Sequence, residues 1–467
     1  MTSTNIVPTN DNRFEKMVSF LKSRTFSFGL GYVSFLGGRL LRDLLLARIL
    51  GAHSFGSWAA LNILRQYGNY SDLGLMNGLS RELPRARKDE NEASELAGHA
   101  VIGTFVGTLA AVVWVLFVQP GGFSTASIGW TTLTLMLTFI CFEKIYKFYN
   151  AVLLGLDRVR HAGLWLTCLS LLDLLLAITG AYFYGIEGLM MGTVVAMTVT
   201  ALAMALNQPL KVKFNFSLAK FKILLFSSLL LMCFGLLNVA LHNFDRTLYL
   251  FLSGGPDPIL GSYHVASLYA LSVSVIPFVL CSVVNPRLYA LKEDDNSEFL
   301  ETISRVGLWS TVIASVVAAS TFLFGPIILK LIFPNQEHSV AISPFLILGE
   351  LFFAASMIMD TVLIVKNKGI RILISKALVM LFVMGAAIVY FKFFNQLTSV
   401  HLARGLSVFM MLAQVGSFLV TYLFCLHSLD NGFKLKTFFK TGTTVLFLAA
   451  TVVLFFASMK IFVLWKI

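Results

Sequence analysis

The sequence predicts an all-α polytopic membrane protein, with about thirteen transmembrane helices that form two six-helix lobes around a central cavity plus one extra C-terminal helix. Three observations support this fold class. Only 13% of the 467 residues are charged, about half the roughly 25% of a typical soluble domain. Mean hydropathy is +0.80, and apolar stretches of spanning length recur along the chain. Basic residues also alternate between successive connections.

The apolar stretches define thirteen predicted spans. They lie at 25–48, 55–78, 98–118, 129–155, 162–184, 187–207, 222–252, 259–286, 305–332, 343–365, 371–392, 400–427 and 441–465. The predicted organisation is a cytoplasmic tail (1–24), an N-terminal lobe (25–208), a cytoplasmic linker (209–221), a C-terminal lobe (222–428) and an additional C-terminal helix region (429–467).

Each predicted lobe has six spans, so both lobes enter the membrane from the same side, as in transporters built from repeats. A short internal echo supports the repeat. Gly56-Ser57-Trp58 opens span two, and Gly261-Ser262-Tyr263 opens span eight at the equivalent position of the second lobe.

Basic residues gather in the N-terminal tail and in every second connection, for example at 81–88, 211–222 and 366–376, where Lys376 is the last of four. The intervening connections, such as 393–399, contain no Lys or Arg. By the positive-inside rule the N-terminus is cytoplasmic, and an odd number of spans places the C-terminus outside. The net charge of +12 therefore reflects membrane topology and attraction to membrane lipid. It does not indicate a nucleic-acid partner.

Enzyme motifs are absent from the sequence. It has no Gly-rich phosphate loop, no HExxH and no paired-cysteine motif. The five cysteines lie in apolar stretches and are expected to be free thiols. We therefore expect no catalytic residue, no metal and no cofactor. A membrane-embedded glycosyltransferase or polymerase stays as a second alternative, although it would need a larger outer loop than this chain offers.

Polar side chains inside spans two and seven recur at helical spacing. Span two carries Asn62, Arg65, Asn69 and Asp72, and span seven carries Asn238, His242, Asp245 and Tyr249, with Arg246 beside that stripe. Ionisable groups in hydrocarbon usually face a cavity or one another. We predict that both stripes line a central cavity. Internal ion pairs that tie helices together are the alternative interpretation.

Arginines in the predicted cavity suggest an anionic ligand. Arg39, Arg42, Arg65 and Arg246 could hold a phosphate-type group, because guanidinium matches its geometry. Helical spacing would also allow Arg39 to pair with Asp43, and Glu143 with Lys147. Basic and acidic residues inside the spans are equal in number, which argues against a plainly cationic cavity.

Three segments resemble polysaccharide flippases, the O-antigen (Wzx-type) branch of the multidrug/oligosaccharidyl-lipid/polysaccharide (MOP) exporter superfamily. The segment 47–83, ARILGAHSFGSWAALNILRQYGNYSDLGLMNGLSREL, is similar to the first two spans of such proteins. The segment 244–269 resembles the start of their second lobe, with its Asp-Arg and Gly-x-Tyr-x-x-Ala. The segment 149–163 resembles the inner turn after span four.

The resemblance implies a transporter that moves polyprenyl-diphosphate-linked oligosaccharide to the outer leaflet of the plasma (inner) membrane by alternating access. The product would serve surface polysaccharide biosynthesis, including lipopolysaccharide O-antigen, and other polysaccharide-assembly membrane proteins would be partners. By position, Arg39, Arg65 and Arg246 would hold the diphosphate.

Coupling to a proton or sodium gradient is common in the superfamily that the chain resembles. The candidates for ion coupling are His242, Asp245, Glu350 and Asp360. A drug or organic-cation antiporter of the same superfamily is the first alternative, and it predicts that acidic residues dominate the cavity. The extra span at 441–465 departs from the twelve-helix core of the superfamily.

Overall fold

The computed structural model describes residues 24–118, 129–207, 210–215, 217–290, 296–336, 338–365, 368–393 and 398–428. Within these residues every regular element is an α-helix, as predicted. The helices are α2 (Arg24–Gly68), α3 (Leu75–Ala86), α4 (Glu90–Val118), α6 (Trp130–Gly155), α7 (Val159–Leu206), α8 (Leu218–Ser253), α9 (Pro258–Ala290), α10 (Asn296–Ile332), α11 (His338–Val365), α12 (Gly369–Phe393) and α13 (Ser399–Ser428).

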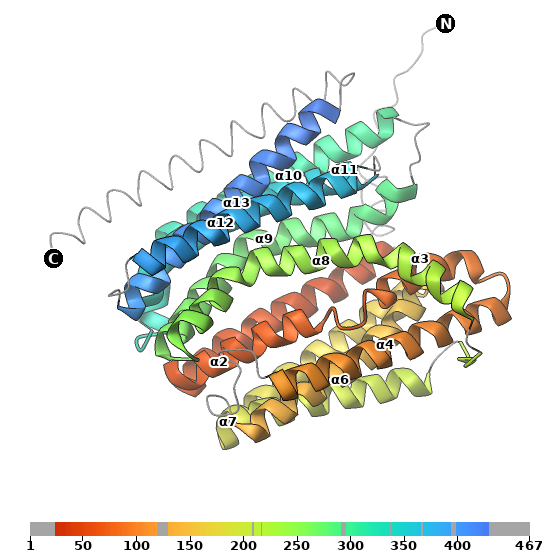
Figure 1. Cartoon of the computed structure of the whole chain (residues 1–467), viewed down its shortest axis with the longest axis horizontal. Helices are drawn as coiled ribbons and strands as arrows, with labels where there is room; N and C mark the ends of the chain where they lie inside the picture. Colours follow the sequence, from red (N-terminus) through yellow and green to blue (C-terminus); the bar gives the residue numbers. More distant parts are fainter. Residues whose placement is uncertain are drawn as a thin grey trace, which may run out of the picture.

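The helices form two groups that meet along α2, α3, α8 and α9 (Figure 1). In the first group, α7 packs against α2 and α6, and α3 packs against α4 and α6. In the second group, α11 lies against α9, α10 and α13, while α12 packs against α13 and α8. Contacts of α8 with α2 and α3, and of α9 with α2, join the two groups. The centre of the molecule is therefore bounded by helices from both halves of the chain.

Nine of the described helices are long and apolar enough to cross a membrane. Two of them, α2 and α7, change direction at kinks where Gly51 (φ 72°) and Gly185 (φ 60°) adopt backbone conformations that favour glycine. Counting each as two crossings, and adding the 26-residue α6 with its charged Glu143 and Lys147, brings the nine to twelve. The predicted thirteenth span at 441–465 lies outside the described residues.

The second predicted span is not one continuous helix. The structure ends α2 at Gly68 and begins α3 at Leu75. In the intervening turn, Leu73 (φ 52°) and Gly74 (φ 72°) are left-handed, and the Gly74 amide donates to Asp72 Oδ1 at 3.3 Å. A short carboxylate that satisfies a turn amide competes with continuation of the helix. The helical spacing that placed Asn69 and Asp72 on one helical stripe therefore fails beyond Gly68.

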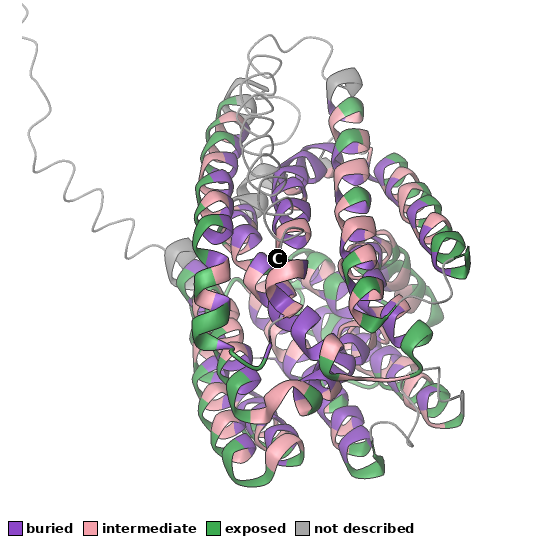
Figure 2. Ribbon diagram, turned by 90° about the vertical axis from the view of Figure 1, so that its left-hand side faces the viewer, coloured by how far each residue is buried: buried purple, intermediate pink, exposed green. Residues whose placement is uncertain are grey.

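Exposed residues recur along the outer helices (Figure 2), and many of them are large and apolar. Phe117 and Leu206 are 84% and 88% exposed, and Phe382 is 78% exposed. Exposed apolar side chains in this number are stable in lipid and not in water. Together with the apolar helices, it makes the chain a multi-pass membrane protein.

Candidate functional site: the central cavity

A cavity of about 880 Å³ lies between the two groups of helices. Its walls come from α2, α3 and α6 on one side and from α8, α9, α11 and α13 on the other. The volume lies in the upper part of the range of roughly 300–1,000 Å³ for small-molecule sites. Because both groups of helices contribute walls, the shape of the cavity depends on how the two groups are placed relative to each other.

The cavity lies toward the end of the bundle that carries the basic connections. Its α2 residues fall between Tyr32 and Asp43 and between Asn62 and Gln66, well away from the kink at Gly51. Close to that kink the two groups touch instead. A Cβ placed on Gly56 would lie 2.2 Å from the Asp257 carbonyl oxygen. The cavity is thus closed at the end opposite the basic connections.

All but one of the predicted site residues line this cavity. These are Arg39, Arg42, Asn62, Arg65, Asn69, Asp72, Asn238, His242, Asp245, Arg246, Glu350 and Asp360. The exception is Tyr249, which is fully buried and donates to Asp257 Oδ2 at 2.6 Å. Its helical register matches the stripe, but it lies too far along α8 toward the closed end to reach the cavity.

Arg42 is committed to structural ion pairs. Its guanidinium binds Asp43 Oδ1 through Nε at 2.9 Å and Nη2 at 2.8 Å, and Nη1 binds Asp173 on α7. Trp58 lies 5.2 Å from the guanidinium carbon. Asp43 therefore pairs with Arg42 and not with Arg39, the partner that helical spacing allowed. Arg42, 3% exposed and held by two carboxylates, has little capacity left for a ligand.

Three cations of the first group surround a single carboxylate, that of Glu143 on α6. Arg65 Nη1 lies 3.3 Å from Glu143 Oε1, and Arg39 Nη2 lies 3.8 Å from the same oxygen. Lys147 lines the cavity one helical turn from Glu143, and it makes no ion pair within 4.0 Å among the residues that the structure describes. The expected Glu143–Lys147 pair is thus replaced by the two arginines.

This set, Arg39, Arg65, Lys147 and Glu143, is called the cationic cluster below. It carries a net charge of about +2 when all four groups are ionised. Arg39 Nε and Glu143 Oε2 are buried and have no hydrogen-bond partner among the described residues. Arg65 is held by Asn62, whose Oδ1 accepts from Nε at 3.0 Å. The unpaired Arg39 Nε donor beside surplus positive charge favours an anionic ligand.

Lys144 stabilises the break between α2 and α3. Its ammonium donates to the Asn69 carbonyl oxygen at 2.6 Å and pairs with Asp72 Oδ1 at 3.3 Å. The side chain is 3% exposed, so it does not extend to the membrane surface. Asn69 and Asp72 line the cavity through this turn and not through a continuous helix.

On the opposite wall, His242 on α8 faces Glu350 on α11. His242 Nε2 lies 3.3 Å from Glu350 Oε1, and the Ser274 hydroxyl lies 2.6 Å from Glu350 Oε2. Beside them, Asp245 accepts from Tyr263 at 2.5 Å and from the Arg246 amide at 2.8 Å. These carboxylates are therefore enclosed by donors of their own half of the chain.

Lys376 is buried in the bundle and does not belong to a basic connection. It is 1% exposed on α12, and its ammonium lies 2.5 Å from Asp360 Oδ2. Thr421 on α13 lies 3.4 Å from Asp360 Oδ1. From sequence alone, a lysine near the start of a span can belong either to the loop or to the interior of the bundle. The ion pair with Asp360 shows that Lys376 belongs to the interior.

Sequence reasoning missed several polar lining residues, among them Gln66, His264 and Ser274, and it also missed the buried Asn243 behind the wall. Asn243 Nδ2 donates to Gln66 Oε1 at 2.9 Å, which links α8 to α2 across the interface. His264 Nδ1 lies 3.0 Å from Arg246 Nη1. Polar side chains within apolar spans were the available signal, but only those in regular stripes or with a charge were selected.

The sequence matches no protein-family model and no curated protein. The fold does match solved structures. An inward-facing multidrug resistance MATE family transporter of the MOP superfamily superposes with a TM-score of 0.69 at 19% identity, covering 85% of this chain and 94% of that chain. Such identity establishes the fold, and the chain has the fold of these transporters.

Two further similar structures show what the fold accommodates. An outward-facing multidrug resistance MATE family transporter matches with a TM-score of 0.61 at 17% identity, covering 87% of this chain and 95% of that one. A MOP superfamily transporter from Pyrococcus furiosus, described as having a binding pocket of reverse polarity that suggests a different function, matches with a TM-score of 0.60 at 17% identity over the same shares of the two chains. The neighbours are transporters, and the inward-facing one fits this conformation better than the outward-facing one.

Proposed function

We propose that this chain is a secondary transporter that flips polyprenyl-diphosphate-linked oligosaccharide from the cytoplasmic to the outer leaflet by alternating access. The cationic cluster binds the diphosphate, and the rest of the cavity takes the sugars. This site is narrower than the sequence suggested. Arg39 and Arg65 stay in it, Lys147 joins it, and Arg42 leaves it because two carboxylates neutralise it.

The surplus of cations around Glu143 is the observation that carries the proposal. The equal numbers of basic and acidic residues in the spans gave no sign of this surplus. The surplus exists because most of the acidic residues are already paired with other cations. Asp72 is bound by Lys144, Glu350 lies against His242, and Asp360 is bound by Lys376. What remains accessible in the cavity is positive. Two guanidinium groups and an ammonium suit the four or more acceptor oxygens of a diphosphate.

Arg246 contributes less to this site than expected. Its Nη2 donates to the His242 carbonyl and to Asn243 Oδ1, both at 2.8 Å, while Nη1 contacts His264. With its two terminal nitrogens engaged in the second group of helices, Arg246 acts mainly as a positioning residue for the opposite wall.

A drug or organic-cation antiporter is the competing function, and the MATE neighbours favour it. Such a transporter needs an available carboxylate to bind its cargo. In this cavity Asp245 is the acid with the weakest cationic contact, since Arg246 Nε lies 3.9 Å from its Oδ1. Asp245 nevertheless accepts from Tyr263 and is 1% exposed, so it is poorly placed to receive a cation.

The proposed setting is the plasma (inner) membrane, with the basic connections in the cytoplasm. The cavity then opens toward the cytoplasm, where the lipid-linked glycan is made, and its closed end faces outward. A proton or sodium gradient would drive the cycle, and polysaccharide-assembly membrane proteins would use the product.

The first prediction tests the site in cells that lack the protein and are complemented with variants. Arg39→Ala combined with Lys147→Ala should leave lipid-linked glycan on the inner leaflet and reduce outward delivery by about 100-fold. The reason is that each charge-assisted contact contributes about 1.5–3 kcal/mol. The measurement is the fraction of lipid-linked glycan in each leaflet, determined with a probe that does not cross the membrane.

Arg85→Ala is the matched control, because Arg85 is a largely exposed arginine away from the cavity wall. It should restore delivery as wild type does. If the deletion leaves glycan sidedness normal, the flippase proposal is wrong, and the organic-cation antiporter takes its place. If Asp245→Asn alone abolishes transport while the double variant is active, the cationic cluster is not the site.

A further inference from the structure

We infer that His242 and Glu350 form a proton-binding site in the wall of the cavity, and that the bound proton stabilises the conformation in this structure. The inference names a coupling ion and its site, and its role in transport rests on the function proposed above. It selects two of the four titratable residues that the sequence offered. The contacts of both residues carry the argument.

The hydrogen-bond partners of His242 determine which of its ring nitrogens carries a hydrogen. Nδ1 lies 2.9 Å from the Asn238 carbonyl oxygen, one helical turn earlier on α8. A carbonyl oxygen only accepts, so Nδ1 must be the donor. In a neutral imidazole the other nitrogen, Nε2, then presents a lone pair.

That lone pair would face a carboxylate oxygen. Nε2 lies 3.3 Å from Glu350 Oε1, and two acceptors at this distance repel each other unless a hydrogen lies between them. The contact requires either an imidazolium beside a carboxylate or an imidazole beside a carboxylic acid. Both arrangements hold one proton more than the deprotonated pair. The observed geometry therefore corresponds to the proton-bound state.

The surroundings hold the two side chains in place. The Ser274 hydroxyl on α9 lies 2.6 Å from Glu350 Oε2, and the His242 ring meets the Phe353 ring edge-on with centroids 4.0 Å apart. Side-chain exposure is 18% for His242 and 9% for Glu350, and both line the cavity. A proton can therefore reach the pair from water in the cavity while the pair itself stays enclosed.

The charged and titratable groups around the pair come from three helices. Arg246 and Asp245 lie on α8, one turn beyond His242, and Asp245 is held by Tyr263. His264 on α9 receives Arg246 Nη1 at its Nδ1, so its hydrogen is on Nε2 and it is neutral. From α2 the neighbouring groups, Gln66 and Tyr67, are ordinarily uncharged. Glu350 is thus the anionic partner of His242.

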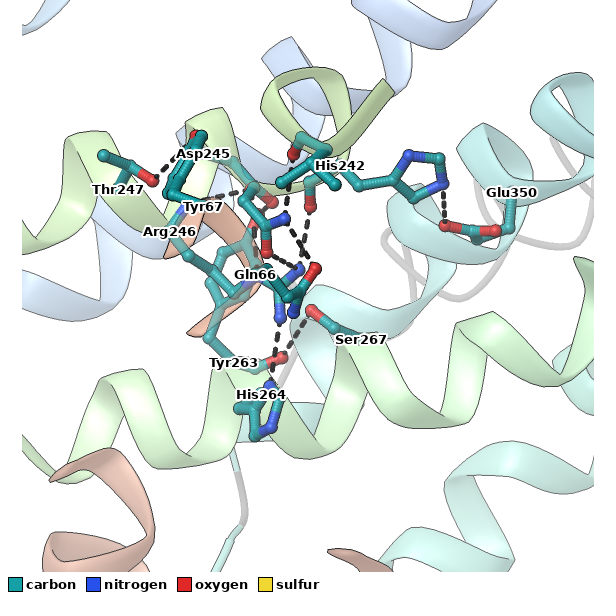
Figure 3. A network of polar contacts seen from close by, with 12 residues as sticks. Gln66, Tyr67, His242, Asp245, Arg246, Thr247, Tyr263, His264, Ser267 and Glu350 are labelled. Carbon is teal, nitrogen blue, oxygen red and sulfur yellow. Dashed lines mark hydrogen bonds and ion pairs between the residues drawn. The ribbon is translucent and has the colours of Figure 1, made fainter. Parts of the chain in front are cut away.

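A chain of contacts connects the pair to the other group of helices (Figure 3). The His242 carbonyl accepts from Arg246 Nη2, which also donates to Asn243 Oδ1. Asn243 Nδ2 in turn donates to Gln66 Oε1 on α2 at 2.9 Å. A second, longer contact joins Thr247 Oγ1 to Tyr67 at 3.5 Å. The same stretch of α8 therefore carries the proton site and the polar contacts between the lobes.

This arrangement gives the proton a mechanical consequence. When the pair releases its proton to water in the cavity, the His242 lone pair faces the Glu350 carboxylate, and the contact between α8 and α11 is lost. A shift of α8 then weakens its contacts to α2. High pH should accordingly favour separation of the lobes at the closed end, and low pH should favour the observed state.

The test measures the distance between the lobes by double electron–electron resonance on the full chain in lipid nanodiscs, without glycan. Spin labels replace Tyr184 at the kink of α7 and Leu331 at the end of α10, two exposed positions on opposite lobes. The natural cysteines are first replaced. In the otherwise wild-type protein, raising the pH should shift the distribution to longer distances.

Glu350→Gln is the informative variant. Its amide can donate to His242 Nε2 without a bound proton, so the short distance should persist at every pH. Glu301→Gln is the matched control, because Glu301 is exposed and pairs with Arg305 on its own helix. It should respond to pH as wild type does. A pH-independent wild type, or a Glu350→Gln variant that responds like wild type, overturns the inference.

A second measurement does not depend on the labels. The ¹⁵N resonances of histidine-labelled protein should include one ring, absent from His242→Gln, that keeps hydrogen on Nδ1 and changes at Nε2 with pH. In Glu350→Gln that ring should stay neutral with an acceptor Nε2. Observation of hydrogen on Nε2 alone would contradict the assigned tautomer and the site.

These readouts also separate the inference from the proposed function. If the lobes respond to pH through Glu350 while glycan sidedness is normal without the protein, the proton site stands and the flippase proposal falls. If the cationic-cluster variants block delivery while Glu350→Gln leaves the pH response intact, the flippase proposal stands and the proton site falls.

Discussion

Partner choice among buried charges decides what each residue in the cavity can do. Arg39, Arg42 and Arg65 look equivalent in the sequence, since each is an arginine within an apolar span. The structure gives Arg42 two carboxylates and leaves Arg39 and Arg65 to share one. A fully paired buried arginine holds helices together, whereas an under-neutralised one can bind an anion. The difference arises from Asp173 and Glu143, which come from separate helices.

Removal of Arg42 should therefore be costly for stability. Arg42→Ala leaves Asp43 and Asp173 buried without their cation, and breaking such a set typically costs about 3–5 kcal/mol. Thermal unfolding of the detergent-solubilised protein measures the loss. Arg85→Ala, which removes a largely exposed side chain from its pair with Glu82, should cost at most about 1 kcal/mol. Equal stability of the two variants would show that the Arg42 pairs contribute little.

At the scale of helices, small residues allow the two lobes to touch at the closed end. The internal echo of the sequence lies here. Gly56 opens the second half of α2, and Gly261 lies near the start of α9. A Cβ on Gly56 would be 3.3 Å from the Gly261 nitrogen, and a Cβ on Gly261 would be 2.3 Å from the Ala52 carbonyl oxygen. Equivalent segments of the two halves thus meet each other across the interface.

Adding a methyl group at this contact should open the closed end. In Gly56→Ala the new Cβ would lie 2.2 Å from the Asp257 carbonyl oxygen, so the helices must separate. A cysteine introduced at Ala52 should then react several-fold faster with an impermeant maleimide. Gly37→Ala is the control, because a Cβ at Gly37 would have no neighbouring atom within 4 Å, so reactivity should stay unchanged. Unchanged reactivity in Gly56→Ala would show that this contact does not close the end.

For the whole molecule, the cavity lies between two lobes that touch near Gly56 and Gly261 at the closed end and along α3 and α8 toward the other end. Alternating access requires the closed end to open during each cycle. The contacts of α2 with α9 near Gly261 form that closure, while α3 and α8 stay packed at the other end. A transporter with this fold can therefore be arrested by linking the lobes at the closed end without touching the cavity.

A crosslink at that end tests the cycle as a whole. His53 and Pro258 are exposed positions that flank the glycine contact, one on each lobe. Cysteines at these two positions, joined by a short bifunctional thiol reagent in a background without natural cysteines, should abolish outward delivery of glycan. Binding of a soluble polyprenyl diphosphate to the purified protein should persist, because the cavity is unchanged. Either single-cysteine variant with the same reagent serves as control. Full delivery by the crosslinked protein would exclude alternating access through this end.

The sequence by itself determined the fold class and most of the charged residues in the cavity wall. Apolar length and low charge require membrane helices, and charged residues within them must be turned inward, whatever the detailed packing. Arg65, His242 and Glu350 could be selected on that ground alone. The spacing of the two polar stripes misled where the backbone left the helix, at Asn69 to Gly74, and where the register continued past the cavity, at Tyr249.

Only the tertiary structure decided which charges are free. Glu143 binds Arg39 and Arg65 and not Lys147, and Lys376 belongs to Asp360 and not to a basic connection. These pairings join helices that are distant in the chain, so spacing along one helix carries no information about them. The physical reason is that a buried charge is stable only beside an opposite charge, and the packing of helices determines which one lies nearest. The same packing brings His242 against Glu350, and thereby creates a proton site from two residues 108 positions apart.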